Sequence, residues 1–222
     1  FDHTLCNLPN YLLRTMVTRP ATALHNQLTQ RFQQGETLFR NLNLAHANLQ
    51  GLNLPFVSLL DAKLTAANLS NVFMPGAELV RARLCHAQLT DANLIGANLL
   101  RSDLQGANLQ RTLLGGAQLM GADLQGANLQ EASLSGANLN GAKFRRADLR
   151  NANLKGADLS GADLRGAKLK GAILEGANLN STLMPDGSYQ TYAASPEPES
   201  QSEHSSAPAS HRSHRQQALS LS

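Results

Sequence analysis

The chain has 222 residues and a formal net charge of +3 at pH 7, and 42% of its residues are hydrophobic. This length suits one domain, and no run of residues approaches the ~20 consecutive apolar residues that a membrane-spanning helix needs. The two cysteines, Cys6 and Cys85, lack the spacing of a zinc site. We therefore interpret them as free thiols in a reducing compartment.

The first 36 residues are predicted to form two short amphipathic helices. Within residues 1–19, the apolar positions have helical spacing and are Leu5, Leu8, Leu12 and Met16. Residues 21–34 carry apolar residues four positions apart, namely Leu24, Leu28 and Phe32. Pro20 separates the two segments, and Gly35 is a plausible C-terminal stop for the second.

From Phe39 to Met184, every fifth residue is a large apolar side chain, nearly always Leu, in thirty positions of unbroken register. A step of five residues advances a helix by about 500° and reverses the side of a strand, so neither element can bury this series on one face. A chain that turns by about 90° after every five residues points all of these side chains inward. We therefore predict an all-β solenoid built of square coils.

The other positions of the repeat support this geometry. The residue two before each Leu is mostly Ala, which is small enough to pack inward beside it. The residue between them is mostly Asn or Asp, whose side chain can bond the backbone at a corner. Two residues after the Leu, Gly is common, as in a turn with φ > 0. In the less regular first coils, Phe56 and Phe73 occupy positions that we expect to face outward.

Residues 121–179 closely resemble the pentapeptide-repeat family, whose pattern is A(D/N)LxX, and they read GADLQGANLQEASLSGANLNGAKFRRADLRNANLKGADLSGADLRGAKLKGAILEGANL. The resemblance implies a right-handed quadrilateral β-helix and a protein without catalytic activity. It also implies a bias toward cyanobacteria, where the family is abundant. On this basis residues 37–189 form a β-helix of about 7.5 coils, residues 1–36 precede it and residues 190–222 follow it.

The first coil of such a solenoid exposes unpaired backbone and an open apolar core unless another element covers it. We expect helix 21–34 to be this cap, and capping is one interpretation of both N-terminal helices. Because one end needs only one cap, the segment around Leu12, Leu13 and Met16 is a candidate for docking to a partner.

Residues twenty positions apart stack directly in this geometry, so the sequence predicts columns on the outer surface. One column contains Gln105, Gln125, Arg145 and Arg165, and the next contains Gln110, Gln130, Arg150 and Lys170. With Arg146 beside the first column, the C-terminal half carries a compact basic patch. It is either an ordinary solvated face or a surface for an acidic partner. Phosphate or nucleic-acid binding is disfavoured, because aromatic residues for base stacking and a recognition helix are lacking.

Near the C-terminus, Pro185, Asp186 and Gly187 predict a tight turn, of a kind that resembles the terminal turn of many family members. Residues 190–222 are rich in Ser, Pro, Glu, His, Gln and Arg, and we expect them to be disordered when alone. Their charge is segregated, with Glu197, Glu199 and Glu203 preceding Arg212 and Arg215.

No arrangement of residues predicts chemistry. The sequence has no nucleophile motif, no zinc spacing and no phosphate loop. We therefore predict no catalytic, cofactor-binding or metal-binding residues and no cofactor. The leading functional hypothesis is a rigid scaffold that contacts other proteins through the N-terminal helix, the basic faces and the tail.

Such a scaffold could hold partners in a large complex, for example as a linker in a cyanobacterial photosynthetic or antenna complex, with a cytoplasmic location. One alternative is a regulatory protein that binds a signalling partner. A second is a DNA mimic that modulates gyrase, as in some family members, but this role needs a strongly negative surface and the repeat region is mildly basic. A third is a fragment fused to an enzyme or membrane domain upstream of Phe1.

Overall fold

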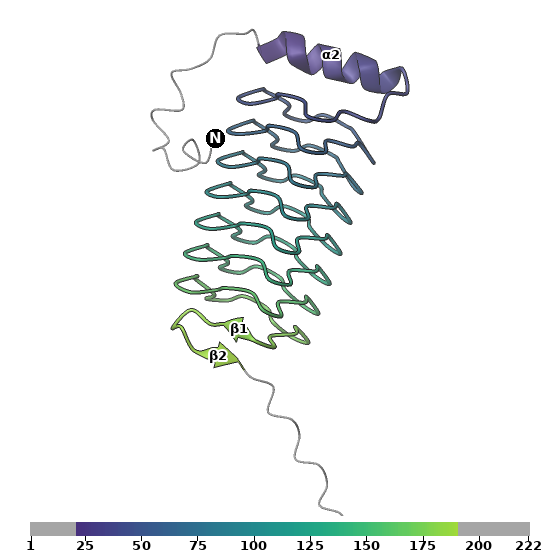
Figure 1. Ribbon diagram of the computed structural model, residues 1–222. Helices are drawn as coiled ribbons and strands as arrows, with labels where there is room; N and C mark the ends of the chain where they lie inside the picture. The colour runs from purple at the N-terminus through teal and green to yellow at the C-terminus, as the bar shows by residue number, and fades with distance from the viewer. Residues whose placement is uncertain (1–20, 191–222) are drawn as a thin grey trace, which may run out of the picture. The chain divides into compact units, whose positions relative to one another are not determined.

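The computed structural model describes residues 21–190, which contain one helix, a stack of four-sided coils and a terminal hairpin (Figure 1). Helix α2 spans Ala21–Gln33 and lies across the N-terminal end of the coils. Strands β1, Thr182–Leu183, and β2, Tyr189–Gln190, form the hairpin at the other end. The fold is the predicted right-handed quadrilateral β-helix.

Every coil takes twenty residues, and each face pairs with the same face of the next coil. Parallel bridges join residues twenty apart, from Leu38 and Ser58 at the start to Asp163 and Leu183 at the end. We name the four faces by their inward residues in the first coil: Phe39 for the first face, Leu44 for the second, Leu49 for the third and Leu54 for the fourth. Later coils repeat each face at intervals of twenty residues.

The interior is formed by the predicted Leu and Ala positions. Leu129 and Ala132 have none of their surface exposed, and Phe144 takes a Leu position with equally complete burial. The bulkier residues that replace Ala in the first coils, such as Val57 and Val72, are also buried. Apolar burial along the whole stack is the main favourable contribution to its stability.

The corners use the predicted turn chemistry. Gly126 has φ of 65°, and residues with side chains adopt the same conformation at equivalent positions, as Arg146 does with φ of 58°. The Asn or Asp before each Leu accepts a hydrogen bond from the backbone N–H two residues later. One example is the bond from Gln130 N to Asn128 Oδ1, 3.2 Å long. The corners that carry this bond are therefore stabilised by backbone conformation and by a side chain.

Helix α2 caps the first coil, as predicted. Leu28 is only 3% exposed and joins the apolar core, and Phe32 packs against that core while partly buried. Gly35 ends the helix with φ of 87°, and its N–H donates to the carbonyl of Phe32 over 2.9 Å. The predicted helix within residues 1–19, with Leu12, Leu13 and Met16, lies outside the described residues.

The C-terminal end is closed less completely than the N-terminal end. The hairpin pairs Leu183 with Tyr189, and the side chain of Asp186 accepts hydrogen bonds from Ser188 in the predicted tight turn. The inward residues of the last coil, Leu169 and Leu174, are nevertheless only partly buried. Of the tail predicted for residues 190–222, Gln190 belongs to strand β2, and residues 191–222 lie outside the described residues.

Candidate protein-interaction site

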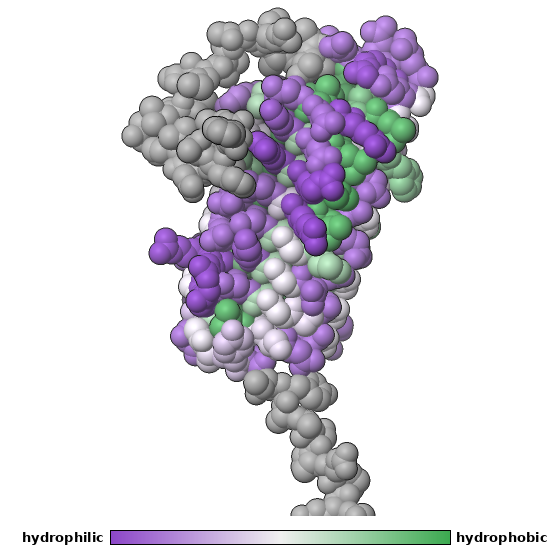
Figure 2. All heavy atoms as spheres, in the orientation of Figure 1, coloured by the Kyte–Doolittle hydropathy of each residue, from purple (hydrophilic) through white to green (hydrophobic). Residues whose placement is uncertain are grey.

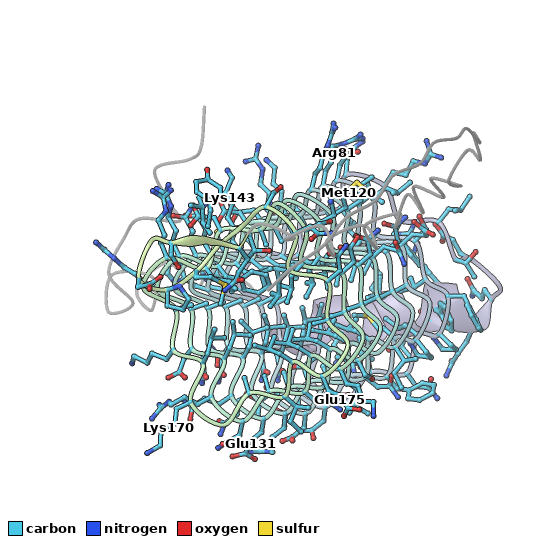
Figure 3. All side chains as sticks on the ribbon, turned by 90° about the horizontal axis from the view of Figure 1, so that it is seen from below. Arg81, Met120, Glu131, Lys143, Lys170 and Glu175 are labelled. Carbon is cyan, nitrogen blue, oxygen red and sulfur yellow. The ribbon has the colours of Figure 1, made fainter. Side chains whose placement is uncertain are left out.

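The five predicted cations of the basic patch lie on the last coils, at the two corners that flank the third face. Arg145, Arg146 and Arg165 occupy the corner between the second and third faces, and Arg150 and Lys170 occupy the corner between the third and fourth faces. Lys170 points outward at one corner, well apart from Lys143 on the second face (Figure 3). The twenty-residue register is what brings these side chains together.

One carboxylate lies between two of the arginines. Asp163 accepts a hydrogen bond from Arg145 Nε over 2.6 Å, and it accepts bonds from Arg165 Nε and Nη2 over 2.9 and 2.8 Å. Asp163 is two residues before Arg165 in the chain and eighteen after Arg145. This sharing was not predicted from the sequence, although the register of twenty residues places Asp163 and Lys143 in one column.

A second carboxylate holds the other corner. Asp148 accepts hydrogen bonds from Arg150 Nε and Nη2 over 2.8 and 2.7 Å, and Lys168 Nζ lies 3.8 Å from it. The hydrogen bonds from the Arg150 side chain are the largest cause that lowers the pKa of Asp148. The Arg150 N–H and the charge of Lys168 lower it further. Asp148 is therefore ionised at neutral pH and fixes the direction of the Arg150 side chain.

The two aspartate side chains are more buried than the arginine side chains that they bind. Arg145 and Arg165 have 49% and 43% of their side-chain surface exposed, whereas Asp163 has 16%. Arg150 and Asp148 differ in the same way, with 43% and 15%. A partner approaching the patch therefore meets positive groups first, although the two carboxylates reduce its five positive charges to a surplus of three.

Arg146 and Lys170 form no ion pair with any residue of the range 21–190. Both side chains are exposed, and both are free to meet an anion without breaking an internal pair. The patch thus combines three arginines held by carboxylates with two cations that are available.

Two apolar surfaces lie on the N-terminal half of the coils. Phe56 and Phe73 are 73% and 44% exposed, as predicted. The ring of Phe56 lies over Gly76, where a Cβ atom would be 2.6 Å from a ring carbon, so a side chain at that position would have to displace the ring. The sequence analysis missed a second, stacked column at the corner between the first and second faces, formed by Leu60, Val80, Leu100 and Met120.

This corner is mixed in character. Figure 3, which looks along the stack, shows Met120 and Arg81 at the same corner, two coils apart. Figure 2 shows hydrophobic residues interleaved with strongly hydrophilic ones below helix α2. Met120 is 42% exposed, whereas Leu60, Val80 and Leu100 are only half-buried.

Cys85 departs from the sequence prediction. It is fully buried and disulfide-bonded, so the expectation of a free thiol is wrong for this residue. Pairing between cysteines far apart in sequence depends on tertiary structure, which their spacing does not reveal. Cys6 lies outside the described residues.

Residues 21–190 lack features of metal-binding and membrane-spanning proteins. Within this range, no three His, Cys, Asp or Glu side chains are grouped so that they could hold a metal ion. The helix in this range is too short and too polar to cross a membrane.

Comparison with known proteins gives a clear match for the repeats. The family model described as pentapeptide repeats matches eight copies, in overlapping segments that together run from residue 43 to residue 180, more than half of the chain. No protein in a comparison with curated sequences matches.

Several solved structures are similar. HetL from the cyanobacterium Nostoc sp. is described as a pentapeptide repeat protein involved in heterocyst differentiation regulation. It shares 30% identity over 74% of this chain and 98% of its own, with a TM-score of 0.41. A pentapeptide repeat protein from the thylakoid lumen of Arabidopsis thaliana shares 35% identity over 42% of this chain and 66% of its own, with a TM-score of 0.41. Rfr23 from the cyanobacterium Cyanothece shares 25% identity over 72% and 99%, with a TM-score of 0.39.

Proposed function

Because the chain belongs to the pentapeptide-repeat family, we propose that it is a non-enzymatic scaffold whose basic patch binds an acidic surface of a partner protein. The N-terminal segment with Leu12, Leu13 and Met16 forms a second contact in this proposal. The partner belongs to a larger assembly, for which a cyanobacterial photosynthetic or antenna complex is one version.

The observation that carries the proposal is that, in the basic patch, the arginine side chains are more exposed than the aspartate side chains that they bind. The side chains of Arg145 and Arg165 are about three times as exposed as the side chain of Asp163 that holds them. Charge-assisted hydrogen bonds from arginine to a carboxylate are directional and can be bidentate. An acidic partner can therefore add to the outer side of guanidinium groups whose inner side is already fixed.

The backbone under the patch supports the same interpretation. Arg146 N donates to the carbonyl of Arg165 over 3.0 Å, and Gly126 N donates to the carbonyl of Arg145 over 2.9 Å. These bonds hold the corner in register with the coils on either side. A preorganised surface loses little conformational entropy on binding, so more of the interaction energy appears as affinity.

Two other functions are less well supported. A regulatory protein that binds a signalling partner would use the same patch. Its complex would be short-lived, whereas the complex of a scaffold is long-lived. A DNA mimic needs an acidic surface, whereas the last coils carry a surplus of positive charge at the patch.

The experiment measures the native size of the full chain in a gentle extract of its source cells. We expect it to migrate with a complex much larger than its own 23.7 kDa. A chain that migrates alone would contradict the scaffold. A stable complex indicates a structural component, and a complex that forms only under some conditions indicates the regulatory alternative.

A matched pair of charge-reversal variants then locates the contact. One variant replaces Arg145, Arg150, Arg165 and Lys170 by Glu, and the control replaces Arg40, Lys63, Arg101 and Lys155 by Glu, so that the net charge changes equally. We expect the first variant no longer to migrate with the complex, although its circular dichroism spectrum shows that it is folded. We expect the control to remain bound. Equal loss in both variants would show that only net charge matters.

A further inference from the structure

We infer that the fourth face of the first four coils binds an amphipathic helix of a partner protein. Eight large apolar side chains within residues 25–190 are exposed. Four of them gather on this face and on the corner that follows it, and we name this set the apolar patch: Phe56, Phe73, Ile95 and Leu113. The other four lie at separate places on the coils and the hairpin: Leu38, Met120, Ile173 and Tyr189. The apolar patch is separate from the basic patch, so this contact is additional to the proposed function.

Three members of the apolar patch come from three successive coils. Phe73 bridges Asn93, and Asn93 bridges Leu113, so the two apolar residues stand in one column. The side-chain oxygen of Asn93 accepts a hydrogen bond from the backbone N–H of Ile95 over 3.1 Å. Ile95 therefore stands beside this column, on the coil between Phe73 and Leu113. Each of the three coils thus presents one large apolar side chain.

The fourth member, Phe56, adopts a backbone conformation that is unfavourable for a bulky residue. Its φ is 59°, whereas glycine occupies the equivalent corner on the next two coils, at Gly76 and Gly96. The ring of Phe56 lies over Gly76 and is still 73% exposed. A ring so exposed contributes little apolar burial to offset the strain. Strain that stability does not explain, together with an exposed apolar ring, is typical of a binding surface.

This side of the coils is almost uncharged. The segments that build it, residues 50–58, 70–78, 90–98 and 110–118, contain three charged residues, Glu78, Asp91 and Arg111. Arg111 donates two hydrogen bonds to Asp91, and Glu78 accepts one from Asn98. An anionic membrane surface attracts proteins through unpaired cations, and these four segments contain none. The apolar patch therefore suits the apolar side of a protein partner better than a lipid surface.

The size of this surface fits one helix better than a second copy of the chain. Four coils spaced by ~4.8 Å, with a face at most ~17 Å wide, cover about 300 Å². A stable dimer buries about 800 Å² on each partner, so the surface supplies less than half of that area. A helix about 10 Å in diameter and about 20 Å long covers an area close to that of the face.

The spacing along the stack also matches a helix. Phe73, Ile95 and Leu113 follow one another at intervals of one coil, which is ~4.8 Å. Apolar residues at positions i, i+3 and i+7 of a helix lie at about 0, 4.5 and 10.5 Å along its axis, within about 1 Å of the three coils. An extended segment presents side chains on one side about every 6.7 Å and is out of register by the second step. A helix with one apolar stripe is therefore the partner that can interdigitate with the apolar patch.

The test titrates a fluorescent helical peptide into the full chain and reads anisotropy. The peptide has Leu at positions i, i+3 and i+7, polar residues and Ala elsewhere, and no net charge. Its control has the same composition with the Leu residues spread around the helix. One protein variant carries Phe56→Gln, Phe73→Gln, Ile95→Gln and Leu113→Gln. The control variant carries Leu38→Gln, Met120→Gln, Ile173→Gln and Tyr189→Gln, which removes the same number of exposed apolar side chains elsewhere.

We expect the wild type and the control variant to bind the striped peptide equally, and the apolar-patch variant to bind it about tenfold more weakly or worse. We expect the control peptide to bind the wild type about tenfold more weakly than the striped peptide. Thermal melts establish that both variants are folded. A benzophenone at one Leu of the striped peptide gives a second readout on the wild type alone, with cross-links expected in residues 70–78 and 90–98.

The helix contact is overturned if the wild type does not bind the striped peptide, if both peptides bind equally, or if both variants lose binding equally. Sedimentation that shows a wild-type dimer and a monomeric apolar-patch variant would assign the surface to a second copy instead. The variant with Glu at Arg145, Arg150, Arg165 and Lys170 should bind the striped peptide as tightly as the wild type. Failure of the proposed function and failure of the helix contact are therefore distinguishable.

Discussion

Ala66 and Ala67 are adjacent in the chain and occupy opposite environments in the fold. Ala66 lies at a corner with φ of 53°, whereas the side chain of Ala67 points into the core and is fully buried. The left-handed conformation costs a residue with a side chain about 1–2 kcal/mol, and glycine avoids that cost. The buried methyl group of Ala67, in contrast, contributes apolar burial.

The same substitution should therefore act in opposite directions at these two positions. We expect Ala66→Gly to raise the free energy of unfolding by up to about 1 kcal/mol, since the relief of strain exceeds the added freedom of the unfolded chain. We expect Ala67→Gly to lower it by about 1 kcal/mol. Urea denaturation followed by circular dichroism measures both, and equal signs would contradict the assignment of corner and core.

A second adjacent pair tests the inward series. Leu114 is fully buried and Leu113 is 41% exposed. Leu114→Asp would place an unpaired charge in the core at a cost of about 3–5 kcal/mol, so we expect the central coils to unfold at ambient temperature. Leu113→Asp should change stability by less than about 0.5 kcal/mol. Thermal melts of the two variants distinguish these outcomes, and similar melts would show that the five-residue register is misassigned.

The cap is tested at helix α2. Leu28→Ala removes a side chain that is 3% exposed and belongs to the core, which typically costs about 2–4 kcal/mol. Gln27→Ala changes an exposed neighbour and serves as control. We expect faster hydrogen exchange at Phe39 and Asn41, whose N–H groups bond the second coil, only in the Leu28 variant. Unchanged exchange there would mean that the first coil holds its structure without the helix.

The charged pairs between coils predict a dependence on pH. Arg111 donates two hydrogen bonds to Asp91, and these bonds are the largest cause of the lowered pKa of Asp91. A carboxyl group whose pKa is lower in the folded state contributes stability above its unfolded pKa of about 3.9. That contribution is lost as the pH falls through the folded value.

Asp91→Asn removes the charge, and asparagine tolerates the φ of 58° found at this corner. We expect the wild type to melt slightly higher than this variant at pH 7, with the difference vanishing below the folded pKa of Asp91. The effect is small because the pair is exposed. If the two proteins differ in melting temperature by the same amount at pH 7 and at pH 2.5, the effect comes from packing and not from ionisation.

The repeating parts of the fold were predictable from sequence because they depend on one local rule. The inward series, the small residues beside it and the turn conformation at positions such as Gly126 follow from the five-residue period alone. Helix α2 was predicted within one residue of its end, since the spacing of Leu28 and Phe32 and the stop at Gly35 are local signals.

The site was predictable only in part, because its decisive contacts join different coils. The columns placed Arg145 above Arg165, but spacing does not show that both side chains turn toward Asp163. The free thiol predicted at Cys85 was wrong because the spacing of cysteines along a sequence does not reveal a disulfide. The contribution of Leu12, Leu13 and Met16 to binding remains a prediction.

Because each coil takes twenty residues, adding or removing residues rotates the later part of the chain about the axis of the stack. An insertion or deletion of twenty residues between Leu99 and Leu139 would lengthen or shorten the stack by one coil and leave every later side chain on its own side. A change of five residues would instead carry the arginines around by a quarter turn relative to helix α2. Growth by whole coils is thus the change that adjusts the separation of the two ends while conserving the direction in which each end presents its groups.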